Sequence, residues 1–308
     1  MIIGKGRSDK AKKRMTESIP KYKTYFADAG LFYAAAIWGS TFFIVKDALS
    51  AIDPVMLVAY RFLLAGVILW LFLLYKKKSI FTGLGRAFFL SVILFLLYVP
   101  QTVGLKYTTA SNSGFITGLF VAFVPLFLRT IFKRKPTLME VIASIISLTG
   151  LGILTGGLED INFGDSLTLI AAVTYALHVL YSDKYMKAGI DPYVISCQQF
   201  LMIGLMSLIT GLVMDLPLTI DSYQAGWIVI FLALFPTLSA FLIQMIAQKI
   251  TSPVKVSLIF AFEPVFAAIF AWTLGGEEVV FHRALGGLFI FSALIISGIP
   301  SPKRRQKL

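Results

Sequence analysis

The stretch that decides the fold is Ser257-Leu-Ile-Phe-Ala-Phe-Glu263-Pro264-Val-Phe-Ala-Ala-Ile-Phe-Ala-Trp272. It is an apolar run of membrane-spanning length that carries a single carboxylate, Glu263. An acidic side chain near the bilayer centre costs about 2.5–3.5 kcal/mol even on lenient scales, so a simple anchor would not contain one. Pro264 removes a backbone donor and frees a carbonyl about one turn earlier. We therefore predict a binding site or hinge at this turn, with pairing of Glu263 to a neighbouring helix as the structural alternative.

The composition extends this interpretation to the whole chain. Hydrophobic residues make up 57% of the 308 residues, charged residues make up 14%, and the mean hydropathy is +0.83. No soluble domain of this length has enough interior to bury so much apolar surface, so the sequence predicts a polytopic membrane protein. The single cysteine, Cys197, excludes a disulfide within the chain.

Apolar runs, each close to the ~20 residues that a bilayer requires, follow one another along the chain with short connections. We predict transmembrane helices at 30–48, 55–75, 86–104, 112–132, 138–156, 165–183, 193–214, 223–246, 254–274 and 283–300. The predicted fold class is an all-α membrane protein with ten transmembrane helices.

The basic residues predict the orientation of these helices. The net charge of +12 does not indicate nucleic acid as a partner, because the basic residues lie in short segments between apolar runs. With the N-terminus in the cytoplasm, the cytoplasmic side receives every Lys and Arg except Lys46, Arg61, Lys106 and Arg283. We therefore predict that both termini are cytoplasmic, as a basic leader over residues 1–27 and a basic tail over residues 301–308.

An internal repeat divides the chain into two five-helix units, 28–157 and 164–300. Ile52-Asp53-Pro54 recurs in the second unit as Ile190-Asp191-Pro192, and Arg61-Phe62-Leu63 with Gly66 recurs as Gln199-Phe200-Leu201 with Gly204. Lys106-Tyr-Thr-Thr109 recurs as Lys249-Ile-Thr-Ser252, and the Phe-x-Pro-x-Phe pattern around Pro125 recurs around Pro264. Because five is odd, the second unit enters the membrane from the opposite side, so the repeats are inverted. Inverted repeats supply two similar arrangements around one central site, which is a transporter's architecture.

Several motifs resemble those of a known family. They occur in one order as Ile37-Trp38-Gly39-Ser40-Thr41-Phe42, Tyr60-Arg61-Phe62, Leu105-Lys-Tyr-Thr-Thr-Ala-Ser-Asn-Ser-Gly-Phe115, and Phe262-Glu263-Pro264 with Gly276-Glu277. Over residues 28–300 the chain is similar to the EamA type of the drug/metabolite transporter superfamily. This resemblance implies ten helices in two repeats, and export of amino acids and other small metabolites. The sequence departs from the family pattern in the sixth helix, where Tyr175-Ala176 replaces the tryptophan–glycine pair.

A site between the repeats would be lined by polar and aromatic side chains, because polar groups that face lipid are costly. We predict that a small-molecule substrate contacts Trp38, Ser40, Thr41, Phe42, Tyr98, Gln101, Asn112, Phe115, Tyr175, His178, Gln244, Phe260 and Glu263. Proline interrupts the backbone hydrogen bonds of a helix, so we predict hinges at Pro100, Pro125, Pro236 and Pro264.

Some of these side chains have alternative roles. Ser40 and Thr41 can bond the carbonyls of their own helix instead of a substrate. His178 either relays protons or binds a carboxylate, or it is a neutral imidazole bonded to a neighbouring tyrosine, which we favour. Arg61 either faces the cavity, pairs with an acid such as Glu263, or extends to the outer headgroups. Protons are a coupling ion only if Glu263 or His178 titrates in the working range.

The predicted function is secondary transport by alternating access, with export of a small metabolite across the plasma (inner) membrane. An amino acid with an apolar or aromatic side chain is the favoured substrate. The alternatives are a broad-specificity exporter of lipophilic compounds and a membrane sensor or scaffold without flux. The sequence contains no glycine-rich phosphate loop and too few Cys and His for a metal cluster, so we expect no ATP hydrolysis, no metal, no cofactor and no enzymatic activity.

Overall fold

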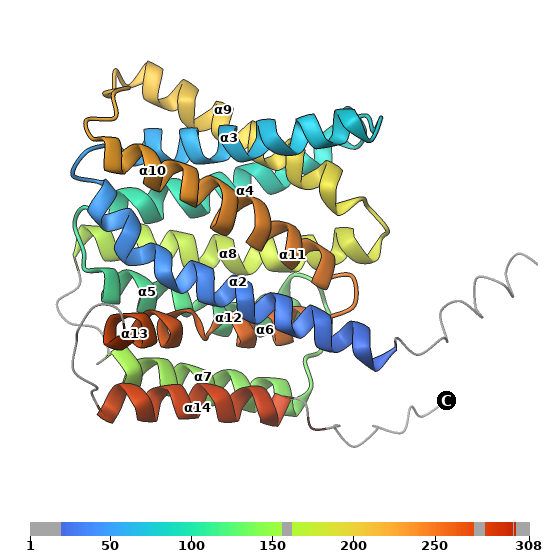
Figure 1. Cartoon of the computed structure of the whole chain (residues 1–308). Helices are drawn as coiled ribbons and strands as arrows, with labels where there is room; N and C mark the ends of the chain where they lie inside the picture. The colour runs from blue at the N-terminus through green and yellow to red at the C-terminus, as the bar shows by residue number, and fades with distance from the viewer. Residues whose placement is uncertain (1–19, 156–161, 274–280, 298, 300–308) are drawn as a thin grey trace, which may run out of the picture.

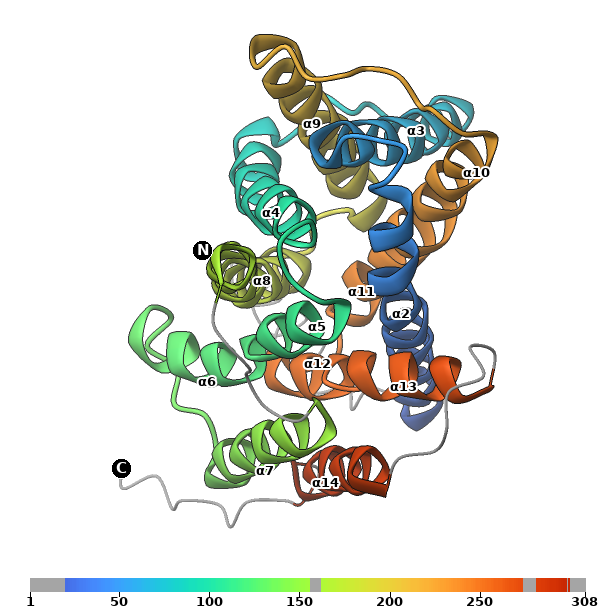
Figure 2. The same ribbon diagram turned by 90° about the vertical axis from the view of Figure 1, so that its left-hand side faces the viewer.

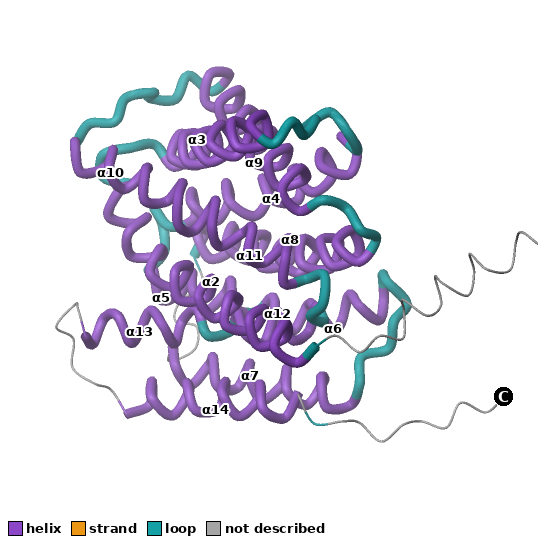
Figure 3. The backbone as a smooth tube through the Cα atoms, turned by 45° about the vertical axis from the view of Figure 1, so that its right-hand side comes forward, coloured by secondary structure: helices purple, strands orange, loops and turns teal. Residues whose placement is uncertain are grey.

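The computed structural model describes residues 20–155, 162–273, 281–297 and 299 (Figure 1). These residues form helices joined by connections, and no strand occurs among them. The predicted leader as far as residue 19, the tail over 301–308 and the Gly276-Glu277 motif lie outside the described residues. The helices run alongside one another, with the connections gathered at two ends of the bundle (Figure 3).

The helices fall into two successive groups. The first group contains α2 (Lys21–Ala48), α3 (Pro54–Tyr75), α4 (Leu84–Gly104), α5 (Ala110–Gly118), α6 (Phe120–Thr130) and α7 (Leu138–Thr155). The second group contains α8 (Phe163–Lys187), α9 (Pro192–Val213), α10 (Tyr223–Leu232), the π-helix η1 (Ala233–Ser239), α11 (Ala240–Ala247), α12 (Pro253–Phe260), α13 (Glu263–Thr273) and α14 (Phe281–Ser297).

Ten membrane crossings account for these segments. Eight spans are long and apolar enough to cross a bilayer, and two shorter apolar helices, Leu138–Leu154 and Ala284–Ser297, provide the fifth and tenth crossings. The predicted all-α fold with ten transmembrane helices is confirmed. Two spans that the sequence predicts as continuous are each divided into two helices, α5 with α6 and α12 with α13. A third span, from α10 to α11, contains the wider turns of η1.

The prolines occupy different places relative to these interruptions. Pro264 is the second residue of α13 and directly follows an interruption, which suits proline because a first-turn N–H has no helical partner. Pro125 lies inside α6, and the interruption in its span falls at Leu119. Pro236 lies inside η1, and Pro100 lies inside the uninterrupted α4. The proline patterns at 125 and 264 therefore do not mark equivalent points of the two repeats.

Other repeated motifs do occupy equivalent positions. Asp53 caps α3 by accepting from the N–H of Val55 at 2.8 Å, and Asp191 caps α9 by accepting from the N–H of Tyr193 at 2.9 Å. In each helix a proline follows the cap, as expected for a first helical residue without an N–H. Thr109 and Ser252 cap α5 and α12 in the same manner. The recurring sequence motifs are therefore matched helix starts.

The two halves meet at reciprocal contacts, in which the repeat counterparts of two contacting residues also contact each other. A Cβ added to Gly66 would lie 2.8 Å from Leu201, and a Cβ added to Gly204 would lie 2.6 Å from Leu63, the repeat counterpart of Leu201. A reciprocal contact between Gly150 and Gly286 joins α7 to α14. The α3–α9 and α7–α14 pairs lie on opposite sides of the bundle, with the other helices between them (Figure 2). Reciprocal contacts of this kind are those of a two-fold relation between the halves.

Candidate functional site

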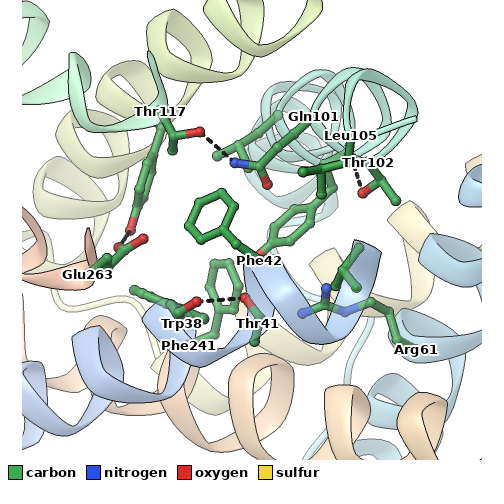
Figure 4. A pocket seen from close by; sticks show the side chains of 14 residues that line it. Trp38, Thr41, Phe42, Arg61, Gln101, Thr102, Leu105, Thr117, Phe241 and Glu263 are labelled. Carbon is green, nitrogen blue, oxygen red and sulfur yellow. Dashed lines mark hydrogen bonds between the residues drawn. The ribbon is translucent and has the colours of Figure 1, made fainter. Parts of the chain in front are cut away.

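A cavity that is partly open to solvent lies between the two halves (Figure 4). It occupies the part of the bundle toward the end where α2 and α4 finish. Its walls come from both repeats and consist of Trp38, Thr41, Phe42, Val45, Arg61, Leu97, Tyr98, Gln101, Thr102, Leu105, Thr117, Tyr175, Phe241 and Glu263.

The structure brings about half of the predicted contact residues to this cavity. Those that line it are Trp38, Thr41, Phe42, Tyr98, Gln101, Tyr175 and Glu263. Those that do not line it are Ser40, Asn112, Phe115, His178, Gln244 and Phe260.

Glu263 lies at the start of α13 and forms part of one cavity wall. Its carboxylate accepts a hydrogen bond from the Tyr175 hydroxyl at 3.3 Å. Among the described residues no ion pair involves Glu263, although the residue is only 6% exposed. The N-terminus of α13 favours a negative charge at this position through the helix dipole. The arrangement leaves a buried carboxylate beside the cavity, available to a cationic group.

Gly39 allows α2 to approach the interruption at Glu263 closely. A Cβ added to Gly39 would lie only 2.3 Å from the backbone oxygen of Glu263 and 3.2 Å from the backbone nitrogen of Ala267. Because both are backbone atoms, no side-chain rotation would relieve the overlap. The glycine of the Trp38-Gly39 pair therefore fixes the distance between α2 and the start of α13.

Arg61 lies on the cavity wall opposite Glu263 (Figure 4). Its Nε donates to the Thr237 hydroxyl at 3.0 Å, and its guanidinium carbon lies 5.0 Å from the centre of the Tyr98 ring. Within the described part of the chain, no carboxylate lies within ion-pair distance of Arg61. Of the three alternatives that the sequence leaves open, the structure supports a cavity-facing arginine and not a pair with Glu263.

The π-helix η1 supplies the polar groups that hold these walls together. Pro236 has no N–H, and in the wider turns of η1 the Thr237 hydroxyl donates to the carbonyl of Leu232 at 2.7 Å. The Trp38 indole N–H donates to the carbonyl of Pro236 at 2.8 Å. A π-helical turn leaves some backbone carbonyls without their usual partners. Here the Trp38 indole of α2 and the Thr237 hydroxyl of η1 donate hydrogen bonds to two of these carbonyls.

We expect Trp38→Phe to destabilise the protein by about 1–2 kcal/mol, because the buried carbonyl of Pro236 loses its side-chain donor in an environment without water. Thermal unfolding in detergent measures this change. The matched control is Trp227→Phe on α10, where the indole is 56% exposed, and this substitution should leave the unfolding temperature unchanged. Equal unfolding temperatures for the two variants would contradict a supporting role for the Trp38 indole.

Three of the predicted residues have hydrogen-bond partners within the protein. The Ser40 hydroxyl donates to the carbonyl of Ile37, and the Thr41 hydroxyl donates to that of Trp38, so both side chains bond their own helix. His178 is fully buried, and its Nε2 lies 2.9 Å from Oε1 of Gln199. The predicted tyrosine partner for His178 is therefore wrong. The partner is Gln199, which is the repeat counterpart of Arg61.

The remaining predicted residues do not line the cavity. Phe260 is 1% exposed and packs edge-on against Trp38, with ring centres 4.8 Å apart. The backbone N–H of Asn112 donates to the cap of α5, and the ring of Phe115 lies toward Gly152 of α7. Gln244 is fully buried, and neither atom of its amide has a hydrogen-bond partner among the described residues.

Sequence reasoning missed part of the cavity lining. The side chains that it did not select are Val45, Leu97, Thr102, Leu105, Thr117 and Phe241, whereas Arg61 was one of its open alternatives. Thr117 was recognisable as a polar residue within an apolar span, and the Gln101 amide donates to its hydroxyl at 2.8 Å. The apolar members carry no such signal, because they cannot be distinguished by type from the lipid-facing and core residues around them.

Comparison with known proteins places this arrangement in a family. A model described as the EamA-like transporter family matches residues 26–156 and again residues 162–299. An uncharacterized transporter of Archaeoglobus fulgidus is 30% identical over 274 residues, which cover 89% of this chain and 86% of that protein. The uncharacterized inner membrane transporter YedA of Escherichia coli is 26% identical over 278 residues, covering 87% and 89% of the two chains.

A solved structure has the same fold. One crystal structure of a protein superposes with a TM-score of 0.76 at 17% identity, covering 88% of this chain and 96% of that one. The two family matches cover both groups of helices and leave only the ends and the central connection unmatched. This chain is a membrane transporter protein that belongs to the EamA-like transporter family.

Proposed function

We propose that this protein is a secondary transporter of the inner (plasma) membrane that exports small metabolites, namely amino acids with apolar or aromatic side chains, by alternating access. The inner-membrane location of the E. coli relative supports the membrane assignment. The proposed topology keeps both termini in the cytoplasm, since the basic residues gather at that end of the bundle. In this topology the cavity opens to the outside.

The observation that carries alternating access is a difference between repeat counterparts. Phe42 and Leu105 line the open cavity. Trp38 aligns with Tyr175 and Lys106 aligns with Lys249, so the counterparts of Phe42 and Leu105 in the second repeat are Val179 and Gln248. These two are in direct contact, because the Gln248 amide donates to the carbonyl of Val179 at 2.9 Å. Matched positions therefore line a cavity at one end of the bundle and are bonded to each other at the other end. If each half adopted the conformation of the other, this cavity would close and the equivalent cavity at the opposite end of the bundle would open.

Gln101 and Gln244 are a second pair of repeat counterparts with different surroundings. Gln101 lines the cavity and donates to Thr117. Gln244, its counterpart in the second repeat, is buried with both amide atoms unpaired among the described residues. An unpaired buried amide is costly, and it is tolerated where another conformation provides its partners. We infer that Gln244 faces the substrate in the inward-open conformation.

The charges of the cavity support an amino acid as substrate. Glu263 and Arg61 lie on opposite walls without a charged partner among the described residues, and aromatic rings of Trp38 and Phe42 lie between them. Two unpaired charges within a membrane are expensive unless a ligand compensates them. A zwitterion offers an ammonium for Glu263, a carboxylate for Arg61 and an apolar side chain for the rings. A broad-specificity cavity for lipophilic cations would use the carboxylate of Glu263 but would not need Arg61.

Counterflow in proteoliposomes tests this function. Vesicles loaded with an unlabelled aromatic or aliphatic amino acid should accumulate the same labelled compound, and unlabelled analogues should compete saturably. If no amino acid exchanges in well-folded protein, while lipophilic cations or dyes do, the broad-specificity alternative takes its place.

The bond between Gln248 and Val179 gives a prediction for the conformational equilibrium. We expect Gln248→Leu to increase the inward-open fraction by about fivefold, since the bond contributes roughly 1 kcal/mol within a membrane. Spin labels on the exposed Lys184 and Lys249, at the ends of α8 and α11, would show a longer distance across this end.

The matched control is Gln198→Leu. The Gln198 amide donates to the carbonyls of Ile80 and Thr82 at the same end, but it joins α9 to the α3–α4 connection rather than α8 to α11. This variant should lower stability without changing the distance between the labels. Equal distance changes in both variants would contradict the assignment of Gln248 to the closed end.

A further inference from the structure

A groove lies between α6 and α7, separate from the central cavity. It is lined by Ala122, Pro125, Leu126, Arg129, Lys135, Pro136, Leu138, Val141, Ser144, Ile145 and Leu148. No residue of this groove belongs to the cavity wall. In Figure 2, α6 and α7 lie at the perimeter of the bundle, so in a membrane this groove faces the lipid.

The walls of the groove are apolar and open to the outside of the protein. Leu126 on α6 is 50% exposed, and Leu138 and Ile145 on α7 are 64% and 60% exposed. From Leu138 to Leu148 the groove follows α7 for about 15 Å at 1.5 Å per residue. This length equals about half of the ~30 Å hydrocarbon core, which is the depth of one leaflet. The groove therefore has the length of an acyl chain.

The same groove has two cations at its end. Arg129 lies in the last turn of α6, and Lys135 lies in the connection just before α7, which places both at the level of the headgroups. Neither side chain takes part in an ion pair with a described carboxylate.

Two nearby charged residues have partners within the protein. Arg134 lies 3.6 Å from the Asp183 carboxylate, and Glu140 accepts from the backbone N–H of Thr137 at the start of α7. The groove therefore has two cations without an ion-pair partner among the described residues at one end, and apolar walls that extend over the depth of one leaflet.

We propose that this groove is a binding site for one anionic glycerophospholipid. Arg129 and Lys135 hold the phosphodiester, and one acyl chain lies along Leu126, Val141 and Ile145. Basic pockets beside transmembrane helices bind anionic headgroups through the same chemistry. The site is independent of the transported substrate, because it shares no residue with the central cavity.

Native mass spectrometry of the purified full-length protein tests the site. The protein is mixed with phosphatidylglycerol or phosphatidylcholine that carry identical acyl chains, and bound lipid is counted as a function of concentration. We expect one phosphatidylglycerol to remain bound at concentrations at which phosphatidylcholine does not. Glycerol phosphate, which lacks acyl chains, should not displace it, and this result separates a lipid site from a site for free phosphate.

Two variants probe the two parts of the groove. Arg129→Gln with Lys135→Gln should weaken phosphatidylglycerol binding by about 30-fold, corresponding to about 2 kcal/mol for two basic residues. Ile145→Trp should fill the trough and abolish binding while both cations remain. The matched control is Lys21→Gln with Lys23→Gln, which removes two exposed charges from the first turn of α2 at the same end.

Two results would overturn the proposal. Equal retention of phosphatidylglycerol and phosphatidylcholine would make the groove an ordinary lipid-facing surface. Equal losses in the groove variant and in the α2 control would assign the effect to general surface charge. Because bound lipid is counted directly, both results are readable even if a variant no longer transports.

Discussion

Glu263→Gln is expected to abolish amino-acid counterflow, with a loss of about 100-fold or more. The substitution keeps the size of the side chain, and the amide oxygen can still accept from the Tyr175 hydroxyl. What disappears is the negative charge that would face the substrate ammonium. Removing one partner of a buried charged pair costs about 2–5 kcal/mol, which corresponds to a factor of about 30 to several thousand.

The matched control for this prediction is Glu140→Gln. Glu140 lies at the start of α7, where its carboxylate accepts from Thr137, and it does not line the cavity. Counterflow by this variant should stay close to that of the native protein. The unfolding temperature of Glu263→Gln should also be close to native, which separates lost transport from lost folding.

The same experiment distinguishes two roles for Glu263. Counterflow exchanges substrate without net proton movement, whereas uptake driven by a pH gradient requires the coupling ion. If Glu263→Gln keeps counterflow but loses gradient-driven uptake, the carboxylate carries a proton and the substrate ammonium has another partner. If the variant keeps both activities, Glu263 is a structural residue and the zwitterion proposal fails.

The second large effect is expected for Gly39→Ala. One methyl group at this position must enter a space where the nearest atom, the backbone oxygen of Glu263, lies 2.3 Å away. Either α2 or the start of α13 has to move, and overpacking of this kind costs typically about 1–3 kcal/mol. The displacement would also move the carboxylate of Glu263 away from the cavity wall. We therefore expect destabilisation near the upper end of that range, about 3 kcal/mol, together with counterflow below a tenth of the native rate.

Gly226→Ala on α10 is the matched control for that substitution. A Cβ added to Gly226 meets no atom within 4 Å. Both substitutions gain the same intrinsic helix propensity, up to about 1 kcal/mol, so the difference between them isolates the close approach at Gly39. Unfolding temperatures in detergent should fall for Gly39→Ala and stay level or rise for Gly226→Ala. Native-like stability and transport in Gly39→Ala would show that this contact is not required.

Composition and motif spacing were sufficient to predict the fold, because a membrane imposes length and polarity on every span. The predicted helix starts after Asp53 and Asp191 occur where the cap and the following proline place them. The interruption at Leu119 was not predictable from Pro125, since the hydrogen bonds of a helix also depend on its packed neighbours. The π-helix at Pro236 likewise has a bond from Trp38, a residue 198 positions away in the sequence.

The site was predictable only in part, and the reason is geometric. A polar residue within an apolar span must face protein, but the sequence does not say whether it faces a cavity or a neighbouring helix. Glu263 and Gln101 face the cavity, whereas His178 faces Gln199. Gln244 does not line the present cavity, although its repeat counterpart Gln101 does. Sequence patterns identify the candidates, and one conformation places only some of them at its surface.

The reciprocal contacts of α3 with α9 and of α7 with α14 restrict where motion can occur. When the roles of the two halves are exchanged, each of these contacts is mapped onto itself: Gly66 with Leu201 becomes Gly204 with Leu63, and Gly150 exchanges with Gly286. A contact with this property has the same geometry before and after the exchange, so it can serve as a stationary pivot. The two pivots flank the remaining helices on either side (Figure 2). Rocking of the helices between two stationary pivots would open one end of the bundle only as far as it closes the other, so a continuous pore would not form during the cycle.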